Sequence, residues 1–221
     1  MKSFNPLHPI FNIHRYGCKP VTIFLVVATL FLAGCSGQAT RPDTTVAINE
    51  TVAPAVIPAS LRSRYQHALT LLQQNKTKRA FVEFGSLTQD YPSYSGPYVN
   101  LALIHVQRNQ PDQAIGLLKQ AISANPISFS GHHQLAILYR KKGRFEDAER
   151  HYIAAKRVDS NHPEVHKDLA ILYDLYMGKL TQALVLYQHY QTLLTQPNPA
   201  LKGWIIDIKN RIKAQEALTQ R

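Results

Sequence analysis

Apolar residues recur at intervals of three and four from about Leu61 onward, which is the spacing of an amphipathic helix. The segment LALIHVQRNQPDQAIGLLKQAISANP contains two such stretches, separated by a polar turn at Asn109, Gln110 and Pro111. The segment HHQLAILYRKKGRFEDAERHYIAAKRVDS repeats the pattern, with Gly143 at the end of its first stretch. Glycine accepts the left-handed backbone of a helix end, so each segment predicts a hairpin of two helices.

The hairpins follow one another at a fixed period. Ala80, Ala114 and Ala148 lie 34 residues apart, and Pro92, Pro126 and Ser160 show the same spacing. A period of this size is typical of stacked helical hairpins, because no single hairpin can bury its apolar face alone. The pattern therefore predicts a repeat protein that presents a surface to a partner.

These residues resemble the tetratricopeptide repeat, a 34-residue helix–turn–helix family. The resemblance rests on a small residue in each first helix, an alanine in each second helix and a large residue four positions later: Ala68, Ala102, Ala136 and Ala170; Ala80, Ala114, Ala148 and Ala183; Phe84, Leu118, Tyr152 and Tyr187. An alanine on one helix leaves room for the bulky side chain of its partner. The resemblance implies an all-α solenoid of about four repeats over residues 61–195, followed by a capping helix within residues 196–221.

The fourth unit departs from the period by one residue, because Ala183 lies 35 residues after Ala148. We expect a longer first helix or a wider turn around Met177 and Gly178 to absorb the extra residue. An open stack of hairpins needs a terminal helix over its last apolar face. After Pro199 we expect such a helix, with Trp204 in its core and its apolar side formed by Trp204, Ile205, Ile208 and Ile212.

The N-terminal segment has the order of a secretory signal. Basic residues come first, and an apolar run from Val21 to Gly34 ends at Cys35. The run covers 14 residues, whereas a membrane-spanning helix needs about 20. Leu32-Ala33-Gly34-Cys35 resembles the lipobox of bacterial lipoproteins, which implies that residues 1–34 are a lipoprotein signal peptide and that Cys35 is lipidated. A non-cleaved signal anchor is the alternative.

The residue after the lipobox cysteine indicates in which membrane a lipoprotein is located. It is Ser36 rather than the aspartate that usually holds a lipoprotein in the inner membrane, so the resemblance implies the periplasmic face of the bacterial outer membrane. Residues 35–60 are rich in Ser, Thr, Pro and Ala, which predicts a lipidated N-terminus and flexible linker with a reach of about 25–30 Å.

Loss of the signal peptide changes both the charge and the cysteine count. It takes Lys+Arg from 25 to 22 against 14 acidic residues, so the net charge falls from +11 to +8. It also removes Cys18, which leaves no free thiol for a disulfide, a catalytic thiolate or a metal site. A location in the cell envelope argues against a nucleic-acid partner. The remaining positive charge is consistent with contact to anionic lipid head groups or with a solvated surface that binds nothing.

Catalytic and metal chemistry find little support in the sequence. Although the chain has ten histidines, His132 and His133 are helix neighbours that diverge by about 100°. His162 and His166 could share a face, but no third ligand stands beside them. No nucleophile–base pair, phosphate loop or zinc-protease helix appears. We therefore expect no enzyme activity, cofactor, metal or small-molecule substrate.

In the tetratricopeptide family the first helix of each unit lines a groove for protein partners. The resemblance places ten residues of this chain in that groove: Tyr65, Leu69, Val99, Leu103, His133, Ile137, Arg140, Lys141, Lys167 and Ile171. They predict an apolar strip that becomes basic toward the third unit. A peptide or helix with apolar anchors and some acidic character would suit it.

The main hypothesis is an outer-membrane lipoprotein that acts as an adaptor in the assembly of an envelope machine such as a pilus or secretion system. It rests on a loose similarity to type IV pilus pilotins, lipoproteins of this repeat fold. A regulatory lipoprotein that binds a peptidoglycan synthase or hydrolase is the alternative. A metal- or ligand-binding periplasmic protein is a third hypothesis.

Overall fold

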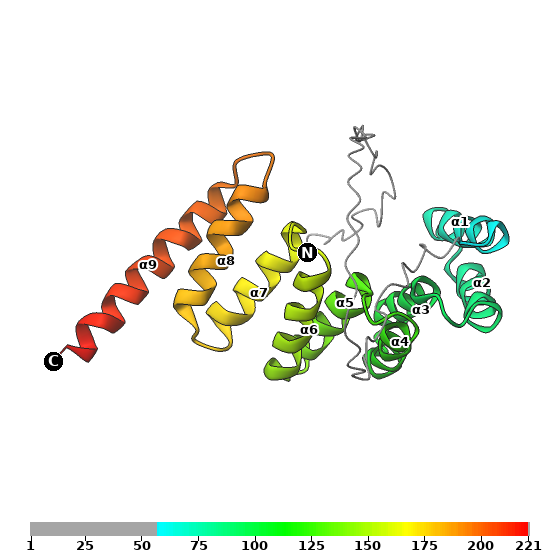
Figure 1. Cartoon of the computed structure of the whole chain (residues 1–221), viewed down its shortest axis with the longest axis horizontal. Helices are drawn as coiled ribbons and strands as arrows, with labels where there is room; N and C mark the ends of the chain where they lie inside the picture. The colour runs from blue at the N-terminus through cyan, green and yellow to red at the C-terminus, as the bar shows by residue number, and fades with distance from the viewer. Residues whose placement is uncertain (1–56, 221) are drawn as a thin grey trace, which may run out of the picture. The chain divides into compact units, whose positions relative to one another are not determined.

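The computed structural model describes residues 57–220, in which every regular element is a helix (Figure 1). The elements are α1 (Ala59–Gln73), α2 (Thr77–Asp90), α3 (Ser95–Gln107), α4 (Pro111–Ala124), α5 (Phe129–Lys141), α6 (Phe145–Val158), α7 (Pro163–Leu175), α8 (Leu180–Leu193) and α9 (Pro199–Thr219). The all-α fold predicted from the sequence is confirmed. The predicted signal peptide, Cys35 and most of the linker lie outside the described residues.

The helices pack in chain order as hairpins. Each helix contacts the next one along the chain, and the contacts are most extensive within the pairs α1–α2, α3–α4, α5–α6 and α7–α8 (Figure 1). We call α1, α3, α5 and α7 the A helices and their partners the B helices. The A helices also touch across units, because α3 contacts α5 and α5 contacts α7. This arrangement is that of stacked helical repeats.

The periodic small and large residues occupy the core as the sequence predicts. All eight alanines of the pattern have no exposed surface, and the large residues Phe84, Leu118, Tyr152 and Tyr187 are at most 2% exposed. Close approach of an A helix to its B helix requires the alanines, and the large side chains fill the space that they leave. Substitution at these positions would therefore disturb packing rather than the surface.

Every A–B turn contains one residue with a left-handed backbone. The φ angles are 58° at Asn75, 57° at Asn109, 73° at Gly143 and 64° at Gly178. Asparagine and glycine tolerate this conformation better than other residues. The first three lie at the 34-residue period, whereas the fourth comes one residue late, so the turn residues follow the same register as the core.

The extra residue of the fourth unit is absorbed in the turn and not in the helix. α5 and α7 both contain 13 residues, but four residues separate α7 from α8 where three separate α5 from α6. In the third unit Arg144 N–H donates to the Tyr139 carbonyl, and in the fourth Lys179 N–H donates to the Tyr173 carbonyl. The two acceptors are 34 residues apart and the two donors 35, so the A helix keeps its register and the B helix shifts by one.

The terminal helix α9 packs on α8 through Leu201, Ile205 and Ile208, which are at most 8% exposed. The prediction that Trp204 lies in the core is wrong, because its side chain is 41% exposed. Its ring lies beside that of Tyr187, with 5.7 Å between centroids. The reason is that α9 has no B helix of its own to cover this side among the described residues.

The buried residues form two clusters. The smaller one joins α1 and α2 to Leu101 and Ile104 of α3, and the larger one extends from Val99 to Ile208 of α9. The first unit therefore has a core largely of its own, while later units share one. No helix within residues 57–220 is both long and apolar enough to cross a membrane.

The left-handed turn of the third unit gives a test of this register. Gly143→Ala is expected to lower the free energy of unfolding by about 1 kcal/mol, because alanine resists a positive φ. No atom lies within 4 Å of the added Cβ, so backbone strain alone is tested. Gly116→Ala is the matched control: Gly116 lies within α4 and is equally open, so alanine there should stabilise by about 0.5–1 kcal/mol. Urea unfolding that gave both variants the same sign of change would contradict the assignment.

Candidate binding surface

The ten residues predicted to line a groove all lie on A helices. They form two rows at the repeat period and two further cations on α5: Tyr65, Val99, His133 and Lys167; Leu69, Leu103, Ile137 and Ile171; Arg140 and Lys141. We call these ten residues the A-helix strip. Contacts between neighbouring A helices bring successive members of the rows together on α3, α5 and α7.

The strip differs in exposure from one row to the other. Val99 and His133 are 6% and 7% exposed, so they belong to the packing between units rather than to an open surface. Leu69, Leu103, Ile137 and Ile171 are half-buried, which leaves part of each apolar side chain accessible. Only the second row therefore offers a continuous set of reachable apolar groups.

Tyr65 connects the first unit to the second. Its hydroxyl accepts a hydrogen bond of 2.6 Å from Asn100 Nδ2, and the same nitrogen lies 3.0 Å from the Gly96 carbonyl oxygen. Burial raises the pKa of the Tyr65 hydroxyl. A Cβ at Gly96 would approach the Tyr65 ring to 3.2 Å, so a larger residue at this position would have to displace the ring by a few tenths of an ångström. Tyr65 is thus held in place by the neighbouring unit.

A polar network joins the third unit to the fourth. Asp168 of α7 accepts a 2.9 Å hydrogen bond from His133 Nε2, and its other oxygen lies 3.8 Å from Arg140 Nη2. Arg140 Nε in turn donates to the Tyr152 hydroxyl at 3.2 Å. Burial, with the nearby Asp168 carboxylate, raises the pKa of Tyr152, so its hydroxyl stays protonated. The network lets buried polar groups meet partners across the unit boundary.

The cations that the strip was predicted to carry toward the third unit are on its A helices, but most of them have acidic neighbours. Arg140 faces Asp168, and Lys167 forms an ion pair with Glu164 one turn earlier on α7. Only Lys141 is exposed and has no acidic partner among residues 57–220. The charges of the strip are therefore largely neutralised within the protein, and its accessible character is apolar.

Asn100, Asp168 and the hydroxyl of Tyr152 were not among the predicted site residues. Asn100 follows Val99 and Asp168 follows Lys167, so each polar group lies 35 residues after the strip residue that it contacts. A polar residue directly after a strip position is the signal that could have indicated this bonding between units.

The histidines of units three and four are used in packing. His132 Nε2 lies 3.0 Å from the Pro126 carbonyl oxygen and His166 Nε2 lies 2.7 Å from that of Ser160, so the two contacts repeat at the 34-residue period. Each histidine also faces one on its B helix: His132 Nδ1 lies 3.0 Å from His151 Nδ1, and the His166 and His189 rings are 4.3 Å apart. In residues 57–220, no three potential metal ligands come together.

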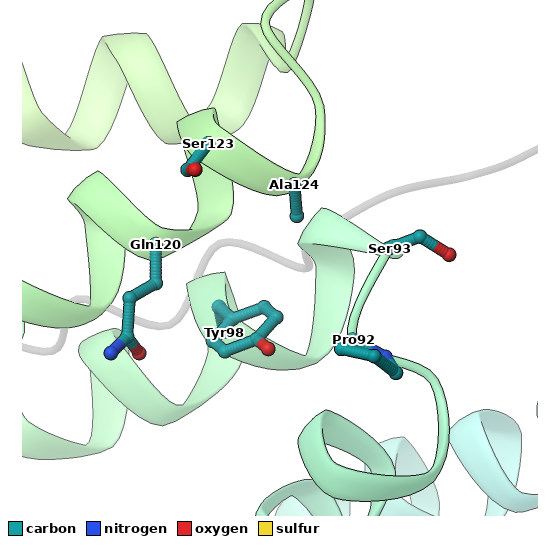
Figure 2. Close-up of a pocket in the computed structure, with 6 residues that line it drawn as sticks. All are labelled: Pro92, Ser93, Tyr98, Gln120, Ser123 and Ala124. Atoms are coloured by element: carbon teal, nitrogen blue, oxygen red, sulfur yellow. The ribbon is translucent and has the colours of Figure 1, made fainter.

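An open depression lies away from the strip, between the α2–α3 loop and the end of α4 (Figure 2). Figure 2 shows the Tyr98 ring between Gln120 and Pro92, with Ser93, Ser123 and Ala124 at the rim. The Tyr98 hydroxyl donates to the Thr88 carbonyl at 3.2 Å. The lining is polar but uncharged, and it contains none of the ten residues predicted to line a groove.

These features together define the described residues as a solenoid of stacked helical hairpins, which is the fold of tetratricopeptide-repeat proteins. The tetratricopeptide repeat family matches residues 105–172. No curated protein matches the chain. Among solved structures, that of pilF from Pseudomonas aeruginosa is 20% identical with a TM-score of 0.60, and the match covers 73% of this chain and 72% of that one.

Two further solved structures support the same fold. A thermophilic tetratricopeptide-repeat protein of Thermus thermophilus is 25% identical with a TM-score of 0.55, over 68% of this chain and 82% of that one. A structure of MamA is 14% identical with a TM-score of 0.52, over 60% and 72%. At these identities the likeness concerns the fold, and the fold indicates a module for protein–protein interaction.

Proposed function

We propose that this chain is an outer-membrane-anchored periplasmic adaptor that mediates protein–protein interactions in the assembly of an envelope machine such as a pilus or secretion system. Tetratricopeptide-repeat proteins generally act as non-catalytic scaffolds, which supports the adaptor role. The lipobox ending at Cys35 supports the membrane anchor, and Ser36 supports the outer membrane.

The half-buried row Leu69, Leu103, Ile137 and Ile171 carries the proposal. One apolar side chain from each of four consecutive A helices is partly accessible, and most neighbouring charges are neutralised within the protein. Such a row matches a partner helix or extended segment that presents apolar anchors at regular intervals. We therefore infer that the strip recognises its partner mainly through the partner's apolar side chains. Acidic groups on the partner contribute less to binding.

The pilus or secretion assignment has a separate basis. The chain combines a predicted lipobox with a repeat stack, and type IV pilus pilotins are lipoproteins of this repeat fold that usually contain more repeats. The fold similarity to pilF of Pseudomonas aeruginosa supports this comparison at the level of architecture. The partner in this proposal is a protein of the envelope assembly.

The test is crosslinking in intact cells followed by capture of the full-length chain. Replacing Leu103 and Ile137 together with glutamine should lower capture of the specific partner about tenfold or more, because central apolar contacts dominate binding energy. Ile127→Gln is the matched control: Ile127 is 71% exposed in the loop before α5 and lies outside the strip. Circular dichroism checks that all variants remain folded.

The outcomes separate the hypotheses. Loss of a secretin or pilus component in the double variant alone supports the proposal. Equal loss in the Ile127 variant would contradict the strip, and specific loss of a peptidoglycan synthase or hydrolase would favour a regulatory lipoprotein. In the same cells, Cys35→Ser should move the chain out of the outer-membrane fraction, and unchanged fractionation would contradict the anchor.

A further inference from the structure

The first two units contain more positive charge than their acidic residues neutralise. Residues 59–124 contain seven Lys and Arg and only three acidic residues. All three acids are already engaged: Glu83 and Asp90 pair with Arg64, and Asp112 pairs with Lys142 of the third unit. The cations of these two units other than Arg64 are therefore without an acidic partner among residues 57–220.

Four of these free cations gather at one corner. Lys76, Lys78 and Arg79 lie in the α1–α2 turn and at the start of α2, and all are exposed. Arg108, at the end of α3, lies over the Phe81 ring at 4.4 Å, which brings the next A–B turn against the same helix. We call Lys76, Lys78, Arg79 and Arg108 the basic corner.

An exposed apolar side chain accompanies the basic corner. Val82 is 70% exposed on α2 and lies one helical turn after Lys78. A surface that mixes free cations with an accessible apolar group is suited to the head-group region of an anionic bilayer, where the cations meet phosphate and the apolar group enters the interface. An acidic protein would satisfy the cations but would leave Val82 exposed or require an apolar match.

The position of the corner in the chain favours a membrane. The basic corner belongs to the first hairpin after the predicted linker that follows Cys35. In a chain anchored at Cys35, fewer residues separate this hairpin from the lipid than any later hairpin. A reach of about 25–30 Å allows the corner to meet the surface, and attraction acts within a Debye length of about 8–10 Å. Units three and four are more nearly balanced, because ion pairs engage most of their charges.

We propose that the basic corner docks the first unit onto the anionic lipid surface to which the chain is anchored. This inference rests on the lipid anchor of the proposed function. It adds an orientation: the first unit lies against the membrane, and the later A helices stay accessible to a protein partner.

The test uses the full-length chain, purified from membranes and reconstituted into vesicles of phosphatidylcholine alone or with about 30% phosphatidylglycerol. Lysine acetylation followed by mass spectrometry measures the accessibility of Lys76 and Lys78. We expect acetylation about fivefold slower in the anionic vesicles, with the protection lost in about 0.5 M salt. Lys202, Lys209 and Lys213, exposed on α9, serve as internal references that should not change.

Charge reversal provides the matched variants. Arg79→Glu with Arg108→Glu should abolish protection of Lys76 and Lys78, whereas Lys209→Glu with Lys213→Glu should leave it intact. Equal acetylation in the two kinds of vesicle would overturn the proposal, as would equal protection of the α9 lysines. Protection by soluble poly-glutamate as strong as that by vesicles would assign the corner to an acidic protein instead. If the chain did not stay on vesicles of phosphatidylcholine alone, the lipid anchor would be contradicted. The docking of the basic corner would still be tested, because protection of Lys76 and Lys78 is measured on the anionic vesicles.

Discussion

Replacing Tyr152 with alanine should lower the free energy of unfolding by about 3–5 kcal/mol. The side chain has no exposed surface and lies in the larger core cluster, where it fills the space left by small residues. Its hydroxyl also accepts a hydrogen bond from Arg140, which would lose this acceptor. The loss is a large share of the stability of an ordinary domain, which is about 5–15 kcal/mol.

The damage should remain local. Repeats contact only their neighbours, so a defect in the third unit spreads mainly to the second and fourth. Hydrogen exchange should accelerate in α3–α8 and change little in α1 and α2, whose core cluster is largely separate. Tyr152→Phe is the control, since it keeps the ring and should cost only about 1 kcal/mol for the lost hydrogen bond. Uniform acceleration along the chain would contradict the separation of the two clusters.

Acidification from about pH 7.5 to about pH 4.5 should destabilise the protein through its packed histidines. Burial, with a smaller contribution from neighbouring His132, lowers the pKa of His151 from 6.5 to about 4. Burial also lowers the pKa values of His162 and His166. Below about pH 6.5 the unfolded chain therefore binds more protons than the folded one, and stability falls as the pH falls.

Burial is the main reason that His151 resists a second proton, which would bind at Nε2 because Nδ1 already carries a hydrogen. His132 Nε2 faces the Pro126 carbonyl as a donor, so its Nδ1 accepts from His151 Nδ1–H at 3.0 Å. Protonation of both rings would place two N–H groups against each other. After allowance for the partial exposure of His151, this residue alone should account for about 2 kcal/mol of the loss.

Urea unfolding at the two pH values measures the effect. The loss should be smaller in His151→Gln, which cannot take up the proton. His67→Gln, at an exposed position of α1, is the matched control and should behave as the unmodified chain does. A free energy of unfolding that is unchanged between the two pH values would show that the histidine contacts do not oppose protonation.

The helical hairpins, their register and the core alanines could be predicted from the sequence because all three depend on local periodicity. The alternative of a wider fourth turn could be read from a single displaced alanine, Ala183. The exposure of Trp204 could not, since it depends on the absence of a covering helix among the described residues rather than on the amphipathic pattern of α9 itself. A pattern indicates which side of a helix is apolar but not how much of it a neighbour covers.

The candidate surface was predicted less well for a related reason. The family register indicates which residues lie on A helices, but the bonding of their polar groups depends on the next unit. His133 and Arg140 both lie close to Asp168 of the next A helix, and the only local signal of this pairing is the place of Asp168 directly after the strip residue Lys167. The excess of positive charge in the first two units can be counted in the sequence, whereas the ion pairs of the fold are needed to show which of the cations lack an acidic partner.

The four-residue turn at residues 176–179 has a consequence for how this chain tolerates change in length. The hydrogen bond that closes the turn is kept although one more residue lies inside it, and the A helix before it stays in phase with its neighbours. An added residue here displaces only the helix that follows, and the repeat family match ends at residue 172, just before this point. This turn therefore tolerates added residues. A short tag or probe inserted there should disturb the packing of the repeats less than one inserted in any of the three-residue turns.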